Sequence, residues 1–326
     1  MVIEDRWLRE TYVDLLIEHA KKDQRIVIVE ADLARAAGTL RFAEELPDRI
    51  VDVGVAEANM IGVAAGMSAM GKIPFTHTFT PFATRRVCDQ VTLSVSYAGL
   101  NVKMMGSDPG VTAEYNGGTH MSMEDISIMR NIPEMVIFEP VDSVQLNEVF
   151  PQILAHDGPV YIRLLRRNAV KIYEAGDAFT LGKGTLIKEG EDVTIIASGI
   201  MVAEALEARK KLAQMGISAE VINIHTIKPL DKELILTSAE KTKAVVVAEN
   251  HSIIGGLGSA VSECLIEDCP VPLKRVGVKD HFGEVGLTGF LKEKYGLTSK
   301  EIVLAAQSVI EKGEVTGNEK SINRIG

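Results

Sequence analysis

Residues 52–91 read DVGVAEANMIGVAAGMSAMGKIPFTHTFTPFATRRVCDQV, and this stretch decides the fold. Its first apolar residues predict a strand, the small residues at 58–70 predict a helix, and KIPFTHTFTPF at 72–82 predicts the next strand, which runs into a loop. Strands that alternate with helices in this way are typical of a parallel sheet covered by helices on both faces. The alternation continues to about residue 165, so we expect a doubly wound α/β domain over residues 1–167.

The alternation lapses over residues 168–190, where Gly and charged residues are scattered. We interpret this stretch as a linker that includes a hairpin. The alternation then resumes and predicts a second, smaller α/β domain over residues 191–313, whose last helix ends near Lys312. The polar residues 314–326 are expected to form a loose tail. The predicted fold class is therefore α/β with two doubly wound domains.

Glu57 lies between a predicted strand and a predicted helix, with apolar and small residues on both sides. A carboxylate buried there would lose its hydration, which disfavours the charged form and favours a carboxyl group able to donate a proton. The alternative is an ordinary acidic residue at a helix N-terminus, which faces solvent and is stabilised by the helix dipole. Glu57 is the first candidate for a catalytic residue.

The composition excludes several classes of protein. Lys and Arg number 35 against 45 Asp and Glu, the formal net charge is −10, and no basic stripe typical of a nucleic-acid binder is found. The three Cys residues lack CxxC spacing, which argues against a zinc site or a disulfide framework and favours a reducing compartment. An amphipathic helix predicted at 6–22 does not resemble a signal peptide, and no apolar run approaches the roughly 20 residues that span a bilayer. We expect a cytoplasmic protein without nucleic-acid or membrane partners.

Several motifs of other enzyme classes are absent from the sequence. The sequence has no P-loop pattern, no His spacing typical of a metal site and no nucleophile elbow, so no metal ligand is predicted in this chain. GGLGSAV at 255–261 lacks the spacing of a phosphate-binding loop. We interpret it as close packing between a strand and the helix that follows.

Aromatic residues gather around the segment that contains Glu57. His77, Phe79 and Phe82 precede a single helix predicted at 83–98, and His120 closes a Gly-rich loop. An isolated His or Phe usually belongs to the core. Aromatic side chains beside a buried carboxyl group are also able to sandwich a flat heterocycle.

Four runs of sequence together resemble the transketolase class of thiamine-diphosphate enzymes. They are GVAEANMIGVAAGMSAMGKIPFTHTFTPFATRRVCDQV at 54–91, GGTHMSMEDISIMRNIPEM at 117–135, TIKPLD at 226–231 and ENHSIIGGLGSAV at 249–261. The likeness extends from near Arg9 to about residue 310 without a large gap. It matches the pyrimidine-binding and C-terminal domains of a full-length transketolase, so the chain is similar to the C-terminal subunit of a split transketolase.

The resemblance implies a partner chain. Enzymes of this class hold the cofactor diphosphate through Mg²⁺, or Ca²⁺, bound by a GDG motif and a downstream Asn, and this sequence contains no GDG. An N-terminal transketolase subunit would then supply the metal and diphosphate site, with an α2β2 assembly implied. The Met and Ala residues within 58–70 would lie at an interface in that assembly.

The resemblance also assigns roles to individual residues. Glu57 matches the glutamate that hydrogen-bonds N1′ of the aminopyrimidine of thiamine diphosphate and donates a proton to it. Phe82 matches the ring that stacks on the pyrimidine, with Phe79 beside it. His120 lies where the family has a residue near the cofactor and the substrate hydroxyls. Asp32, with Leu33, matches an Asp-Leu pair close to the cofactor.

The implied substrate residues depart from the usual pattern. Arg9 and Arg166 match arginines that bind the sugar phosphate, and bidentate anion binding suits them. Asp108 stands where typical transketolases have a phosphate-contacting His, and an anion beside a phosphate is unfavourable by about 1 kcal/mol or more. Asn116 replaces an Asp that contacts a substrate hydroxyl.

The segment that follows Asp32 departs as well. Ala36 replaces a phosphate-binding Ser, and Arg35 would restore positive charge nearby. These departures favour a two-carbon ketol transfer from a branched ketose phosphate or a sulfonated ketose to an aldose phosphate. The usual xylulose 5-phosphate and ribose 5-phosphate pair is disfavoured.

Three other functions remain open. A 1-deoxyxylulose-5-phosphate synthase or the β subunit of a 2-oxoacid dehydrogenase shares the cofactor and the glutamate but decarboxylates a 2-oxo acid. A scaffold subunit without turnover is a third alternative. TIKPLD at 226–231 and the stand-alone two-domain layout fit transketolase better. The β subunit of a 2-oxoacid dehydrogenase also has two domains, so length does not separate it from transketolase.

Overall fold

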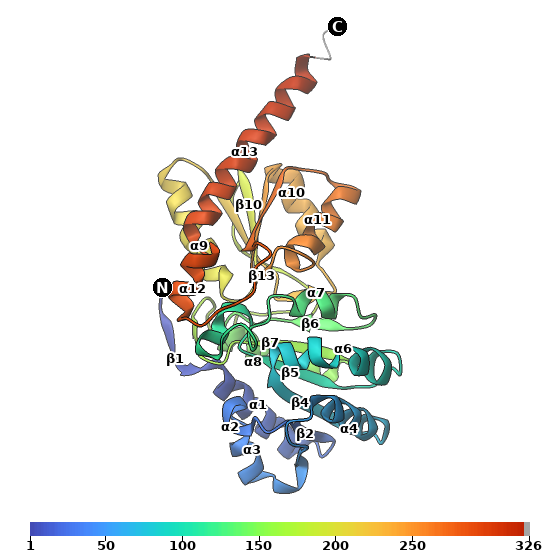
Figure 1. Cartoon of the computed structure of the whole chain (residues 1–326). Helices are drawn as coiled ribbons and strands as arrows, with labels where there is room; N and C mark the ends of the chain where they lie inside the picture. Colours follow the sequence, from blue (N-terminus) through green and yellow to red (C-terminus); the bar gives the residue numbers. More distant parts are fainter. Residues whose placement is uncertain (323–326) are drawn as a thin grey trace.

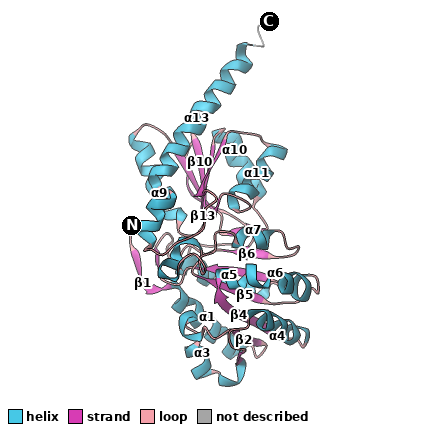
Figure 2. Ribbon diagram, viewed as in Figure 1, coloured by secondary structure: helices cyan, strands magenta, loops and turns pink. Residues whose placement is uncertain are grey.

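The computed structural model describes residues 1–322, with side chains described as far as Lys312. Two stacked α/β units, each built on its own sheet, make up the molecule (Figure 1). Helices lie on both sides of each sheet (Figure 2). The fold class is as predicted.

The first sheet has seven strands in the order β12-β6-β7-β5-β4-β2-β3. All neighbouring pairs are parallel except β12 with β6. The strands are β2 (Ile26–Glu30), β3 (Ile50–Asp52), β4 (Ile73–Phe79), β5 (Lys103–Ser107), β6 (Val136–Phe138), β7 (Val160–Leu164) and β12 (Thr226–Lys228). Parallel strands align their carboxyl ends at one edge of the sheet, where the loops after β3, β4, β5 and β7 emerge.

Each face of this sheet has its own apolar core. Helices α1 (Leu8–Lys22) and α8 (Ser143–Ala155) cover one face, where Tyr12 and Phe75 pack against Phe150. Helices α4 (Glu57–Ala69) and α7 (Asp125–Arg130) contribute to the core on the other face. Burial on both faces explains why the strands read as nearly continuous apolar runs.

The second sheet has five strands in the order β14-β13-β10-β11-β9, with only β9 antiparallel to its neighbour. Its strands are β9 (Thr185–Lys188), β10 (Val193–Ala197), β11 (Ala219–Asn223), β13 (Val245–Ser252) and β14 (Leu273–Val278). Side chains of α9 (Met201–Gln214) and α13 (Ser299–Ile322) pack into the core of one face, and those of α10 (Lys232–Thr242) and α11 (Leu257–Asp268) into that of the other.

Shorter elements complete the chain. They are β1 (Ile3–Trp7), β8 (Asn168–Val170), α2 (Ala34–Ala37), α3 (Leu40–Glu45), η1 (Pro47–Arg49), α5 (Thr80–Ala83), η2 (Arg85–Val87), α6 (Cys88–Gln90), η3 (Val91–Ser96), η4 (Gly110–Asn116) and α12 (Thr288–Tyr295). The single helix predicted at 83–98 is wrong, because the segment is broken into η2, α6 and the π-helix η3.

The two ends of the chain and the linker also differ from the prediction. Residues 3–7 form β1, which pairs with β8, and β9 pairs with β11, so the predicted hairpin within 168–190 is wrong. Helix α13 continues to Ile322, past its predicted end near Lys312 and into the predicted loose tail. Residues 323–326 of that tail lie outside the described residues.

The two units are joined by more than the linker. Strand β12, from the TIKPLD motif, leaves the second unit and adds an antiparallel edge to the first sheet. Arg163 of β7 is fully buried and binds Asp125 of the first unit at 2.7 Å (Nε to Oδ2). Its Nη2 donates to the backbone oxygen of Asn250 in β13 at 2.7 Å. The carboxyl edge of the first sheet is therefore held against the second unit.

None of the described helices has both the length and the hydropathy that crossing a bilayer requires.

Candidate active site

Glu57 is buried at the start of α4, just beyond the carboxyl end of β3. Its exposed fraction is 4%, so the expectation of burial is confirmed and the solvent-facing alternative is wrong. Its Oε1 accepts a hydrogen bond from Nη1 of Arg86 at 2.6 Å. A buried carboxylate with a guanidinium partner avoids the large cost of an isolated buried charge. The pairing with Arg86 was not predicted from the sequence.

Phe82 packs on this ion pair, and two further aromatic rings pack on Phe82. The guanidinium carbon of Arg86 lies 3.8 Å from the centre of the Phe82 ring, in a cation–π arrangement. The His120 ring meets Phe82 edge to face at 5.0 Å between centroids and meets Phe79 at 5.7 Å. The structure thus brings Glu57, Phe79, Phe82 and His120 together from three segments, as predicted. We call these four residues and Arg86 the Glu57 cluster.

His77 does not belong to this cluster. It is fully buried in β4, where Nε2 lies 3.0 Å from the hydroxyl of Tyr12 and Nδ1 lies 3.6 Å from Oε1 of Glu30. Burial lowers the pKa of His77 to about 3, so the ring is neutral near pH 7. Burial also raises the pKa of Glu30 to about 8, which keeps that carboxyl group protonated.

The Gly-rich loop takes its shape from contacts with the second unit. Asn250 of β13 accepts a hydrogen bond from the backbone N–H of Val111 at 3.0 Å and donates one to the backbone oxygen of Pro109 at 2.8 Å. A Cβ atom at Gly110 would lie 2.3 Å from Oδ1 of Asn250, and one at Gly118 would lie 2.2 Å from the backbone oxygen of Gly283. Only glycine allows these approaches, so the second unit fixes the loop that carries His120.

A second cluster of charges lies where β5 and β7 end. Asp108 has a left-handed backbone (φ 57°) and a fully buried side chain, and its Oδ2 lies 3.1 Å from Nε of Arg166. Within the part of the chain that the structure describes, neither carboxylate oxygen of Asp108 has a hydrogen-bond partner, and neither does Nε of Arg9 or Arg166. Burial raises the pKa of Asp108 to about 6, against the opposing charges of Arg166, Arg167 and Arg9.

Glu114 completes this cluster. Its Oε2 binds Nη2 of Arg167 at 2.7 Å, and its Oε1 accepts from the backbone N–H and the hydroxyl of Thr288 in α12, at 3.0 and 2.6 Å. Arg9 donates to the backbone oxygen of Ala36. We call the five charged residues the arginine cluster: Arg9, Arg166, Arg167, Asp108 and Glu114.

Among the described residues, four predicted site residues form no hydrogen bond or ion pair with either cluster. Asp32 is exposed with φ 59°, and its backbone N–H donates to Oδ1 of Asp52 at 2.9 Å. Leu33 is half-buried and Arg35 is exposed, and no hydrogen bond or ion pair joins them to either cluster among the described residues. Asn116 is half-buried, with Nδ2 buried and without a hydrogen-bond partner.

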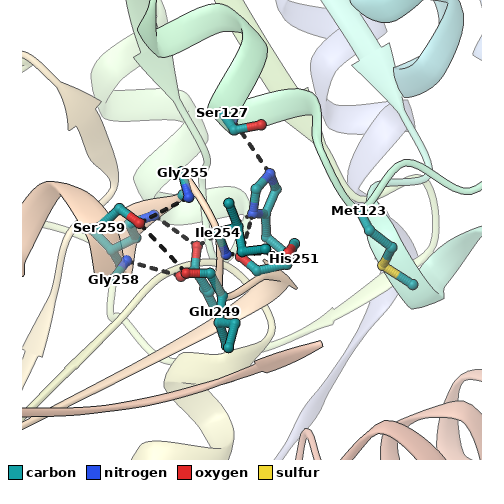
Figure 3. Close-up of polar contacts among 12 residues, drawn as sticks. Met123, Ser127, Glu249, His251, Ile254, Gly255, Gly258 and Ser259 are labelled. Carbon is teal, nitrogen blue, oxygen red and sulfur yellow. Dashed lines mark hydrogen bonds and ion pairs between the residues drawn. The ribbon is translucent and has the colours of Figure 1, made fainter. Parts of the chain in front are cut away.

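The GGLGSAV loop is filled by the chain itself. The carboxylate of Glu249 accepts from the backbone N–H groups of Leu257 at 2.7 Å and Gly258 at 2.9 Å, at the N-terminus of α11 (Figure 3). A Cβ atom at Gly256 would lie 2.0 Å from that carboxylate. The interpretation as strand-to-helix packing is confirmed, because an internal carboxylate takes the place that an anion would need.

His251, near the end of β13, contacts the first unit. Figure 3 shows His251 reaching Ser127, whose backbone N–H lies 3.4 Å from Nε2. Burial lowers the pKa of His251 to about 4, so this contact involves a neutral ring. Among the described residues, no group of His, Cys, Asp and Glu is arranged to hold a metal ion.

Two family models match the chain. The model described as "Transketolase, pyrimidine binding domain" matches residues 7–171, and "Transketolase, C-terminal domain" matches residues 182–302. The chain belongs to the transketolase family. These enzymes are thiamine-diphosphate-dependent transferases, and the chain is a C-terminal subunit of the split form, which implies an N-terminal partner subunit.

Individual relatives agree with this assignment. The 6-deoxy-6-sulfo-D-fructose transketolase subunit SqwH of Clostridium sp. (strain MSTE9) is 70% identical over 95% of this chain and 96% of its own length. A split-gene transketolase solved as an inactive β4 tetramer is 43% identical, covers 94% of this chain and 98% of its own, and superposes with a TM-score of 0.86. The 1-deoxy-D-xylulose-5-phosphate synthase 1 of Geobacter sulfurreducens is 35% identical over 91% of this chain but only 47% of its own length.

The position of α4 corrects one expectation about the subunit. Met60, Ala64 and Ala65 are buried in the core of the chain, so the Met and Ala residues of this helix are not all available for an interface. Gly62 and Gly66 face open space, with no atom within 4 Å of a Cβ built there.

Proposed function

We propose that this transketolase subunit acts on a sulfonated ketose and transfers its two-carbon ketol unit to an aldose phosphate, in complex with the N-terminal partner subunit. The burial of Glu57 among Phe79, Phe82 and His120 carries the catalytic part of the proposal. The arginine cluster and the 70% identity to SqwH support the donor. The decarboxylating synthase alternative is less well supported, because its full-length relatives match over only about half their length.

The Glu57 cluster suits the pyrimidine half of thiamine diphosphate. Phe82, beside Phe79, offers an aromatic face, and Glu57 offers a carboxyl group in a dry environment. When bound, the cofactor supplies the carbanion-stabilising chemistry that splits and joins ketoses. Because the described residues hold no metal-ligand group, we assign the Mg²⁺ or Ca²⁺ and the diphosphate to the partner subunit, in an α2β2 assembly.

Glu57 would hold the proton that faces N1′ of the cofactor. In this structure Nη1 of Arg86 lies 2.6 Å from Oε1 of Glu57. Arg86 is 45% exposed and can leave, whereas Glu57 is fixed at the start of α4. Departure of Arg86 would leave the Glu57 carboxyl group free to face the cofactor in a dry pocket.

Substrate binding would fall to the arginine cluster. Arg166 is 18% exposed and has Asp108 as its only ion-pair partner among the described residues, so part of its guanidinium is free for an anion. Arg9 would assist from α1, and Asn116 and His120 would face substrate hydroxyls. Asp32, Leu33 and Arg35 remain candidates near the cofactor.

The decisive experiment is Glu57→Gln in the complex reconstituted with the N-terminal partner. Proton transfer by a positioned side chain contributes roughly 10²- to 10⁴-fold, so we expect kcat to fall within that range. The control is Glu18→Gln, an exposed residue that pairs with Lys22 at 2.6 Å. A Glu57→Gln complex with wild-type turnover would contradict the role of Glu57.

A donor panel tests the substrate. Steady-state rates would be compared for 6-deoxy-6-sulfo-D-fructose, xylulose 5-phosphate and a branched ketose phosphate with one aldose acceptor. A clear optimum for xylulose 5-phosphate would refute the proposed donor. Release of CO₂ from pyruvate would favour the synthase, and failure of calorimetry to detect binding of thiamine diphosphate to the complex would favour a scaffold.

A further inference from the structure

The arginine cluster contains two acids that an anion site for a sugar phosphate would not need. Three guanidinium groups and two carboxylates leave one net positive charge at the ends of β5 and β7. Glu114 has a structural role, because it holds Arg167 and the start of α12 through Thr288. Among the described residues, the side chain of Asp108 makes one ion pair, with Arg166, and that pair lacks hydrogen-bond geometry.

A buried carboxylate with both oxygens lacking hydrogen-bond partners is costly for the fold. Asp108 also holds a left-handed backbone conformation, which adds strain for a residue other than Gly. Asp108 therefore destabilises the fold both through its buried charge and through its backbone conformation. Such a residue is more typical of a functional site than of a packed core. The cost falls beside Arg166, the cation that forms the ion pair with Asp108 and is 18% exposed.

Charge is the property by which a protein can distinguish a sulfonate from a phosphate or phosphonate. A sulfonate and a phosphate or phosphonate group each present three oxygens in similar geometry, so shape discriminates poorly between them. A sulfonate carries one negative charge, whereas a phosphate monoester carries about −1.5 to −2 near pH 7. In a partly buried site the second negative charge is repelled by a nearby carboxylate.

We propose that Asp108 is the residue that selects a sulfonated sugar over a phosphorylated one, by reducing the charge of the arginine cluster to a value that suits a monoanion. It also fixes Arg166 through their 3.1 Å ion pair. This inference rests on the proposed function, because it specifies the donor for the same site. It makes Asp108 a determinant of specificity and leaves the chemical step to the Glu57 cluster.

The test compares two donors that differ mainly in charge, 6-deoxy-6-sulfo-D-fructose and its 6-phosphono analogue, in the reconstituted two-chain complex. We expect the wild-type complex to favour the sulfonate. Asp108→Asn keeps the size of the side chain and removes its charge, so the ratio of kcat/KM for sulfonate over phosphonate should fall about tenfold, mainly through KM for the phosphonate. The wild-type ratio should rise with pH as the phosphonate loses its second proton.

The matched control is Asp14→Asn, which removes a carboxylate from the exposed face of α1, where it pairs with Arg6 at 2.7 Å. It should leave the ratio unchanged. A folded Asp108→Asn complex whose ratio stays within twofold of wild type would overturn the inference, as would a wild-type preference for the phosphonate. If Asp108→Asn does not fold, Asp108→Ser replaces it with the same expected outcome.

The two proposals fail in different ways. If the wild-type complex transfers ketol units only from unsulfonated donors, the proposed function fails. If the wild-type complex is active on the sulfonate, and the Asp108→Asn complex shows the same ratio of sulfonate to phosphonate as wild type, only the role of Asp108 fails. Should no donor be turned over, calorimetric titration of the two compounds into the complex measures the same ratio as affinities.

Discussion

Replacing Glu30 by Gln should flatten part of the pH dependence of stability. Glu30 is fully buried in β2, its Oε1 accepts a hydrogen bond from the hydroxyl of Thr39, and Nδ1 of His77 lies 3.6 Å away. Burial raises its pKa from 4.5 to about 8, while the unfolded chain keeps the ordinary value. Glutamine has the same shape and can accept the same hydrogen bond without ionising.

The sign and size follow from the difference in bound protons. Since the pKa of Glu30 is higher in the folded state, its proton stabilises the fold fully below pH 4.5, and this contribution is lost as the pH rises towards 8. Between these values the folded state holds about one more proton, so the free energy of unfolding falls by about 1.4 kcal/mol per pH unit. From pH 5 to pH 7 the variant should gain about 3 kcal/mol relative to wild type.

Urea unfolding followed by circular dichroism at pH 5, 6, 7 and 8 measures this difference. Asp108 and Glu249, whose pKa values are also raised by burial, are present in both proteins and cancel in the comparison. Glu44→Gln, an exposed residue of α3, makes the same chemical change and should leave the wild-type pH profile intact. Parallel curves for Glu30→Gln and wild type would refute the reasoning.

Two further changes test the packing. Gly190→Ala would place a Cβ atom 2.1 Å from the backbone nitrogen of Glu220, so we expect the free energy of unfolding to fall by about 3 kcal/mol. Gly289→Ala would place its Cβ atom with nothing within 4 Å, so this control should be neutral or slightly stabilising. Thermal melts of the two variants measure the difference. Arg163→Met would leave buried Asp125 without its cation and should cost about 3–5 kcal/mol in urea unfolding, and an unchanged midpoint would show that this buried ion pair does not stabilise the fold.

The alternation of elements could be predicted from the sequence because the central strands are buried on both faces and the long helices bury apolar residues against the sheets. Irregular helices and strand pairings could not be predicted in the same way. The π-helix at Val91–Ser96 and the antiparallel addition of Thr226–Lys228 to the first sheet depend on neighbours from other segments. Local propensity contains no information about those neighbours, so the single helix and the hairpin were wrong.

Some features of the candidate site could likewise be predicted from the sequence, and others could not. The sequence by itself indicated Glu57, because a lone acid between apolar runs is informative, and it indicated the aromatic and arginine residues through their resemblance to a family. Only the tertiary structure decided that Arg86 holds Glu57 and that Asn250 of the second unit shapes the Gly-rich loop. It also decided that Asp108 is buried against Arg166. Each of these contacts joins residues that are far apart along the chain, and the free energy that selects them comes from burial and charge pairing, which exist only once the sheets have formed.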